Sequence, residues 1–150
     1  GYIGAGKTTF SRRLERQVSA VRFTHDEWMR RLYGEDPPEQ QFVELAQRVS
    51  SLMEEVWRRC LDVGVDVVLD FGFWSRAERD LIRSAVTGLG ADFKLYRLNC
   101  PDSVAWKRIE ARNAAADKGI YIAANTFAVL KSRFQPLDDD EVRIEVQQDP

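Results

Sequence analysis

The chain begins with the run Gly-Tyr-Ile-Gly-Ala-Gly-Lys-Thr, which satisfies the pattern G-x-x-x-x-G-K-[ST] without a gap. Glycines in this pattern let the backbone turn tightly and aim its N–H groups at an anion. A helix that follows directly presents the positive end of its dipole to the same anion. The run therefore predicts a phosphate-binding loop, whose nucleotide-binding positions are Gly1, Gly4, Ala5, Gly6, Lys7, Thr8 and Thr9.

Two side chains of this loop carry specific chemistry. A lysine at the position of Lys7 reaches the β- and γ-phosphates of a nucleoside triphosphate, so we predict a catalytic role for it. A hydroxyl at the position of Thr8 ligates Mg²⁺. The alternative is a glycine-rich start to a helix that binds no ligand. The surrounding pattern of strands and helices favours the nucleotide site.

Helical and strand patterns alternate along the chain. Helices are predicted over 7–18, 26–33, 40–61, 75–87, 101–113 and 126–134, and strands over 20–24, 65–71, 93–99 and 142–146. Strands separated by helices imply parallel pairing with right-handed crossovers. We therefore expect an α/β fold: a three-layer P-loop NTPase domain with a mostly parallel sheet, formed as one domain by residues 1–150.

A phosphate loop ordinarily connects a strand to a helix. Here the sequence starts at the first glycine of the loop, so only the loop and the helix are present. We expect the strand before the loop, which is the central strand of such a sheet, to be missing from the given sequence.

Two carboxylates follow predicted strands, at the sheet edge where open α/β folds bind their ligands. Asp26 is predicted to orient or deprotonate a phosphate-acceptor hydroxyl, and a helix N-cap is a compatible second role. Asp70, which ends the run "VDVVLD", is predicted to support the Mg²⁺ shell, with capping of the following turn as the alternative. His25 is the only histidine and is either part of this site or incidental.

Arg108 and Arg112 are four residues apart and therefore lie on one helical face. They lead into the glycine-containing loop 114–125, as expected of a lid that closes over a triphosphate. Guanidinium groups there would neutralise the charge that develops during transfer. The alternative is a solvated basic face that pairs with Glu110 or Asp102.

Three further features leave their roles open. Phe71, Phe73 and Trp74 follow a strand end, where they would either line a pocket for the phosphate acceptor or pack into the core. Arg76 and Arg79 come shortly afterwards and are candidates for substrate contact. The acidic run over 136–141 is most simply a solvated turn.

Together these features resemble the small P-loop kinases of the AAA-type ATP-binding family, which include polynucleotide 5′-kinase, chloramphenicol phosphotransferase and zeta toxins. The loop has the usual form G-x-x-G-x-G-K-[ST] of these kinases, and the two aspartates and the arginine-bearing helix follow in the same order. The resemblance implies ATP and Mg²⁺ as cofactors. It also implies that Asp26 activates the acceptor and that Arg108 and Arg112 are lid arginines.

One departure from these relatives bears on the substrate. Polynucleotide kinases carry basic residues beside the aspartate after the second strand, whereas this chain has His25 and Glu27 there. The formal net charge is −2 and the isoelectric point is about 5.5. Both observations argue against a nucleic-acid phosphate acceptor, and the charge excludes a strongly basic surface overall.

The leading prediction is therefore a kinase that moves the γ-phosphate of Mg²⁺·ATP to a hydroxyl of a small molecule. The alternatives are a polynucleotide 5′-kinase and a regulatory NTPase without a phosphate acceptor. No apolar run approaches the roughly 20 residues of a membrane helix, so we expect a cytoplasmic protein without a membrane partner. The sequence carries no signal for the oligomeric state or for the choice between ATP and GTP.

Overall fold

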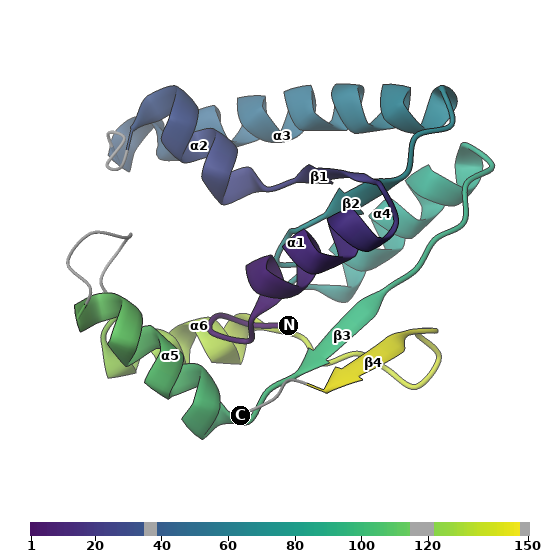
Figure 1. Cartoon of the computed structure of the whole chain (residues 1–150). Helices are drawn as coiled ribbons and strands as arrows, with labels where there is room; N and C mark the ends of the chain where they lie inside the picture. Colours follow the sequence, from purple (N-terminus) through teal and green to yellow (C-terminus); the bar gives the residue numbers. More distant parts are fainter. Residues whose placement is uncertain (35–38, 115–121, 148–150) are drawn as a thin grey trace. The chain divides into compact units, whose positions relative to one another are not determined.

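The computed structural model describes residues 1–34, 39–114 and 122–147 (Figure 1). In this part of the chain helices and strands alternate in the predicted order, and every predicted element is present. The elements are α1 (Lys7–Gln17), β1 (Val21–Phe23), α2 (His25–Tyr33), α3 (Glu39–Asp62), β2 (Val67–Leu69), α4 (Arg76–Gly88), β3 (Tyr96–Asn99), α5 (Asp102–Ala114), α6 (Ala124–Arg133) and β4 (Ile144–Gln147). The α/β class is confirmed.

Most strands are shorter than their predicted ranges, because backbone groups of the flanking residues form hydrogen bonds to other segments. Before β2, the Val65 N–H donates to the Cys60 carbonyl at 2.8 Å and so closes the end of α3. The start of α4 agrees closely with its prediction. Ser75 accepts a bond from the backbone N–H of Glu78, and the Glu78 side chain accepts one in return, which completes the predicted capping box.

The four strands form two parallel pairs instead of one continuous sheet. β1 pairs with β2 in the register Val21↔Val67, and β3 pairs with β4 in the register Tyr96↔Ile144. Within the described residues the two pairs share no hydrogen-bonded ladder, so a single sheet is not shown. The three-layer arrangement stays a prediction.

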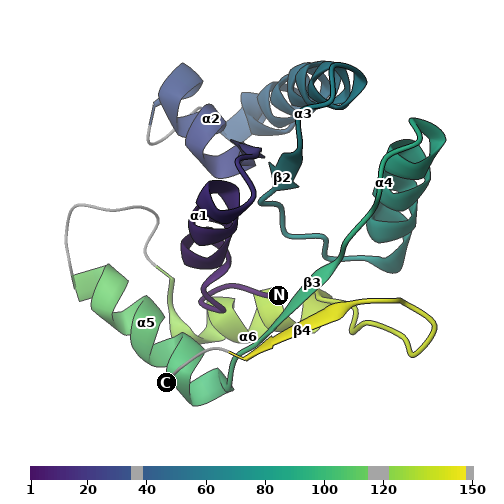
Figure 2. The same cartoon turned by 45° about the vertical axis from the view of Figure 1, so that its right-hand side comes forward.

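The chain divides into two compact units, each with its own parallel pair. The first unit comprises Gly1–Lys7 and Gly72–Pro150, and the second comprises Thr8–Phe71. In the second unit α2 packs on α3, and Figure 2 shows α3 close to end-on beside α2. Within the three described ranges, none of the helices is long and apolar enough to cross a membrane.

The long helix α3 buries a narrower stripe than its sequence pattern predicts. Val49, Met53 and Trp57 are at most 1% exposed, and their spacing of four residues follows one helical face. Phe42 and Leu52, which were predicted on the same face, are 45% and 48% exposed. Apolar spacing therefore located the helix correctly but overestimated the width of its buried face.

The acidic run over 136–141 is not a solvated turn throughout, which corrects the prediction. Glu141 is 1% exposed and accepts two hydrogen bonds from Arg79, at 2.6 and 2.8 Å. Arg79, also 1% exposed, is committed to this pair, so its buried position does not favour substrate contact. Two residues 62 positions apart in sequence thus form a buried ion pair in the first unit.

This ion pair predicts a pH-dependent stability. The hydrogen bond from Arg79 lowers the pKa of Glu141 below its usual 4.5, so its stabilising contribution is present above that value and lost as the pH falls through the lowered pKa. Glu141→Gln should cost about 3–5 kcal/mol at neutral pH because it leaves a buried guanidinium unpaired. Urea unfolding at several pH values measures the difference in the free energy of unfolding, which should narrow at acidic pH.

Asp139→Asn, at an exposed site in the same turn, should cost no more than about 0.5 kcal/mol. A pH-independent difference for Glu141→Gln would contradict the assignment.

Candidate nucleotide-binding site

The phosphate loop is a tight turn that two glycines make possible. Gly4 and Gly6 have φ values of +78° and +83°, in the left-handed region that other residues rarely adopt. The backbone N–H of Ala5 donates to the Tyr2 carbonyl at 3.3 Å, and the Lys7 ammonium donates to the same oxygen at 3.0 Å. The loop thus folds back over the Tyr2 carbonyl, with Lys7 held at its end.

Gly4 is required by space as well as by backbone conformation. A Cβ atom at this position would lie 2.6 Å from the carbonyl oxygen of Ala105 in α5. Ala105 is fully buried, so its backbone has little room to move away. The loop is therefore packed directly on α5, which is the fit expected of a preformed cradle for phosphates.

A matched pair of substitutions separates these two requirements. Gly4→Ala meets both a positive φ and the Ala105 carbonyl, whereas Gly90→Ala meets a φ of +75° with nothing within 4 Å. Both should lose about 1–2 kcal/mol of stability from the backbone conformation. Only Gly4→Ala should also weaken Mg²⁺·ATP binding, by at least about tenfold, as measured by titration calorimetry. Unchanged nucleotide affinity in Gly4→Ala would contradict the site.

Tyr2 connects the loop to the start of α5 through hydrogen bonds of its hydroxyl. Its hydroxyl lies 2.6 Å from a carboxylate oxygen of Asp102 and 2.9 Å from the Cys100 carbonyl. Burial and the bond to Asp102 raise the pKa of Tyr2, so the phenol remains a neutral donor. Asp102 also pairs with Lys131, and this bond and the one from Tyr2 lower the pKa of the Asp102 carboxyl. Tyr2 was not predicted from the sequence, because its position in the motif accepts any residue.

The predicted lid arginines lie on the helix that supports the loop. Arg108 and Arg112 follow Ala105 by three and seven residues, so all three share one face of α5. Arg108 is half-buried, with one guanidinium nitrogen 3.7 Å from the Cys100 sulfur, and Arg112 is exposed. Asp102 pairs with Lys131 and not with these arginines, which argues against the alternative that the arginines pair with Asp102. Residues 115–121 of the predicted lid lie outside the described residues, and the roles of both arginines stay predictions.

In the second unit, Ser11 lies one helical turn after Thr8 on α1 and donates a hydrogen bond to Asp70. The Ser11 hydroxyl is 3.0 Å from the Thr8 carbonyl and 2.8 Å from a carboxylate oxygen of Asp70, whose side chain is 3% exposed. Hydroxyl and carboxylate oxygens are the donors that Mg²⁺ prefers, and this ion usually takes one or two protein ligands together with substrate phosphates. The hydroxyl of Thr8 and the carboxylate of Asp70 fit that donor set. Within the described residues, no cluster of three or more His, Cys, Asp or Glu residues could hold a metal ion.

Arg22 orients the Asp70 carboxylate and was not identified from the sequence. One of its guanidinium nitrogens lies 3.2 Å from Asp70, and its other groups pair with Glu27 at 2.8 Å and Glu15 at 3.2 Å. Burial opposes its charge, but the hydrogen bonds to Glu27 and the nearby carboxylates raise the pKa of Arg22. The polar network around Asp70 therefore contains Ser11 and Arg22 in addition to the predicted residues.

Asp26 is free to act at the surface of the second unit. Helix α2 begins at His25 with Thr24 as its N-cap, because Thr24 is still extended, with φ −131° and ψ 112°. The prediction that Asp26 caps this helix is therefore wrong. Asp26 is exposed in the first turn, and no hydrogen bond or ion pair of its side chain is found among the described residues. His25 lies with Nε2 3.1 Å from the Ala46 carbonyl of α3, which favours a structural role for it.

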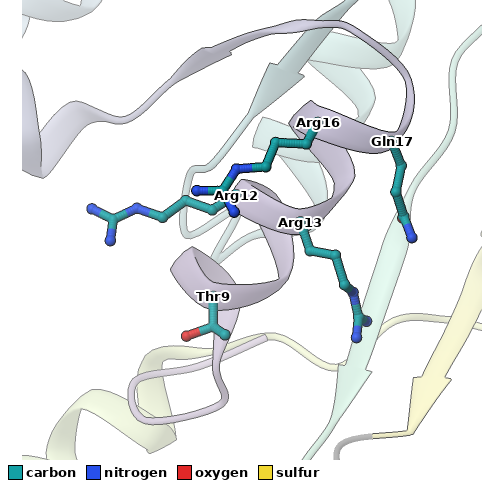
Figure 3. A pocket seen from close by; sticks show the side chains of 5 residues that line it. All are labelled: Thr9, Arg12, Arg13, Arg16 and Gln17. Atoms are coloured by element: carbon teal, nitrogen blue, oxygen red, sulfur yellow. The ribbon is translucent and has the colours of Figure 1, made fainter.

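The outer face of α1 is basic. Figure 3 shows a shallow hollow lined by side chains of this helix, in which Arg12 and Arg16 extend to one side and Arg13 to the other. Thr9, which follows the predicted metal ligand Thr8, lines the same hollow. Arg12 is partly neutralised by Glu27 at 2.7 Å. This face gives the start of α1 a positive field that favours anions.

Comparison with known proteins identifies the family. A family model described as an AAA domain matches residues 1–137, a range that includes the phosphate loop and every predicted site residue. No curated protein matches the sequence. The matched range covers most of the chain, and it begins with the phosphate-loop motif that binds nucleotides in this class of domain. The chain is therefore a member of the AAA domain family, with the phosphate loop of a nucleotide-binding protein.

Proposed function

We propose that the protein is a phosphotransferase that moves the γ-phosphate of Mg²⁺·ATP to a hydroxyl group of a small molecule. The observation that carries this proposal is the exposed Asp26 carboxylate, which lies in the same unit as Thr8 and Asp70. The neighbouring Glu27 is held by Arg12 and Arg22, whereas Asp26 is available to a ligand. A site that only binds nucleotide does not need such a carboxylate.

The phosphate loop holds the donor nucleotide in this proposal. Lys7 and the backbone N–H groups of the loop bind the β- and γ-phosphates, since the first N–H groups of a helix lack intrahelical partners. Thr8 and Asp70 would hold Mg²⁺, with Ser11 and Arg22 fixing the Asp70 carboxylate. When bound, Mg²⁺ supplies neutralisation of the charge on the β- and γ-phosphates.

Asp26 and the α5 arginines act on the transfer itself. Asp26 accepts the proton of the acceptor hydroxyl, whose oxygen forms a bond to the γ-phosphorus while the bond from that phosphorus to the β–γ bridging oxygen breaks. Arg108 and Arg112 neutralise the charge that develops on the transferred group. They also help to exclude water, because an open site would lose the phosphoryl group to hydrolysis.

A polynucleotide 5′-kinase is the second candidate, and the basic face of α1 favours it. Arg12, Arg13 and Arg16 would neutralise backbone phosphates of a nucleic acid. The acidic neighbour Glu27 beside Asp26 argues against a polyanion at this position. The rate of transfer to a nucleic acid would fall steeply as the salt concentration rises, whereas the rate of transfer to an uncharged small molecule would not.

Acceptor dependence of ADP formation tests the proposal. The rate is measured with Mg²⁺·ATP alone, with a protein-free small-molecule fraction of a cell extract, and with a 5′-hydroxyl oligonucleotide. We expect the small-molecule fraction to raise the rate. Stimulation by the oligonucleotide alone, with a steep salt dependence, would support the second candidate. Equal rates in all three conditions would contradict transfer and favour a regulatory NTPase.

A further inference from the structure

The hollow on the outer face of α1 has the size of a ligand site, and the leading proposal assigns it no role. Its volume is about 500 Å³, within the range of small-molecule pockets. Thr9, Arg12, Arg13, Arg16 and Gln17 line it (Figure 3), so it carries three guanidinium groups and no carboxylate. We call this feature the α1 hollow. Its charge favours an anion as the ligand.

Two of the guanidinium groups are placed to act on one anion. Arg12 and Arg16 are four residues apart on α1, and Figure 3 shows both side chains extending to the same side of the helix. Like charges at this spacing repel each other, so a bound anion would relieve the repulsion. A phosphate dianion can accept hydrogen bonds from two guanidinium groups at once, whereas a carboxylate carries a single charge that one guanidinium neutralises. The pair therefore favours a phosphate group.

Both of these side chains have donors available to a ligand. Arg16 is exposed, and no hydrogen bond or ion pair of its guanidinium is found in the described part of the chain. Arg12 has a 55% exposed side chain and binds Glu27 at 2.7 Å through one nitrogen, which leaves its other N–H groups for a ligand. Arg13 extends to the other side of α1, and its guanidinium lies 5.5 Å from the centre of the Phe10 ring.

The α1 hollow adjoins residues that the proposed function uses. Thr9 directly follows Thr8, the predicted Mg²⁺ ligand, in the first turn of α1. The bond between Arg12 and Glu27 joins α1 to the first turn of α2, where Glu27 is the residue after Asp26. All of these residues belong to the second compact unit. A small molecule held in the α1 hollow can therefore extend a hydroxyl group to the turn that carries Asp26.

We propose that the α1 hollow binds a phosphate group already present on the acceptor, so that the substrate is a phosphomonoester with a free hydroxyl group. This inference rests on the proposed phosphotransferase function and narrows its substrate class. Arg12 and Arg16 bind the existing phosphate, which does not react. The hydroxyl oxygen of the same molecule forms a bond to the γ-phosphorus, the bond from that phosphorus to ADP breaks, and Asp26 accepts the hydroxyl proton. The products are ADP and a molecule with two phosphate groups.

Removal of phosphate from the candidate acceptors tests the substrate class. A small-molecule extract is divided into two portions, which are treated with alkaline phosphatase or mock-treated, and the phosphatase is then filtered out. The full chain is added to each portion with Mg²⁺ and fresh γ-labelled ATP. We expect the mock-treated portion to give a labelled product that carries two phosphate groups by mass spectrometry. The phosphatase-treated portion should give none.

Arg16→Gln and Arg12→Gln test the site. In each variant the half-saturating concentration of the mock-treated extract should rise by at least about tenfold, as expected for loss of a charge-assisted hydrogen bond. Half-saturation by ATP should change little. Arg59→Gln is the matched control, because Arg59 is an exposed arginine in the last turn of α3 in the same unit. It removes the same charge and should match the unmodified chain.

The outcomes that would overturn the inference differ from one another. Labelling that survives phosphatase treatment would show that the acceptor carries no phosphate. Unchanged half-saturation in both α1 variants would show that the acceptor phosphate binds elsewhere. Transfer to a 5′-hydroxyl oligonucleotide alone, with a steep salt dependence, would assign the α1 hollow to a nucleic acid. In these three cases the unmodified chain still transfers phosphate, whereas absence of transfer to every acceptor would overturn the proposed function as well.

Discussion

Replacement of Lys7 by alanine is expected to reduce γ-phosphate transfer from ATP by at least about 10²–10³-fold. The ammonium of Lys7 lies 3.0 Å from the Tyr2 carbonyl at the end of the phosphate loop, within a turn packed on α5. In the proposed reaction it stabilises charge on the β- and γ-phosphates. The motif holds no second lysine that could take over this role. Single-turnover transfer with saturating acceptor fraction measures the loss.

Lys107→Ala is the matched control for this substitution. Lys107 is an exposed lysine of α5 in the same unit as the loop, so its loss removes one positive charge without changing the motif. It should alter transfer by less than about threefold, as expected for a surface charge of little electrostatic weight. Equal losses in the two variants would mean that net charge, and not the position of Lys7, explains the effect.

Asp26→Asn is expected to reduce transfer by about 10²–10⁴-fold while leaving ATP affinity nearly intact. Asparagine keeps the size of the side chain but cannot accept a proton from the phosphate-acceptor hydroxyl. The side chain is exposed in the first turn of α2, so the fold should tolerate the change. Transfer under single-turnover conditions and ATP titration by calorimetry separate the two effects.

Glu27→Gln is the control for Asp26→Asn. Glu27 is the adjacent carboxylate, and bonds from Arg12 and Arg22 lower its pKa although burial works in the opposite direction. Its loss should reduce stability through these ion pairs, without removing transfer. Full transfer by Asp26→Asn, or a larger loss in Glu27→Gln, would assign the proton acceptor to another group.

Local sequence signals predicted the parts of the fold that local physics decides. The glycine motif located the loop, and the structure shows its two positive-φ glycines at the expected positions. Ser75 and Glu78 identified the start of α4 through a capping box that needs only neighbouring residues. Apolar periodicity located α3, although the exposed Leu52 shows that periodicity does not measure the width of a buried face.

Contacts between distant residues were not readable from one sequence. Arg79 and Glu141 are 62 residues apart, and the acidic run looked like a solvated turn because nothing local marks one carboxylate as buried. Ser11 and Asp70 are 59 residues apart, yet Ser11 is a turn beyond Thr8 on α1, a spacing that could have suggested it. Tertiary pairing, and not propensity, decides each of these contacts.

The start of α2 shows the limit of local signals at helix ends. An aspartate after a strand is a common N-cap, but Thr24 and Asp26 both qualify by residue type. The extended backbone of Thr24 places the cap two residues earlier than predicted. Because Thr24 is the N-cap, the Asp26 side chain makes no capping bond, and its carboxylate can accept a proton as the proposed function requires.

The central claim is transfer of the γ-phosphate to a small molecule, and the destination of that phosphate tests it most directly. We would incubate the protein with γ-labelled ATP, Mg²⁺ and a pooled small-molecule extract, and separate the labelled products by chromatography, with Lys7→Ala alongside. We expect a labelled organic phosphate that is absent with Lys7→Ala. Label found only in inorganic phosphate, or in none of the products, would contradict it.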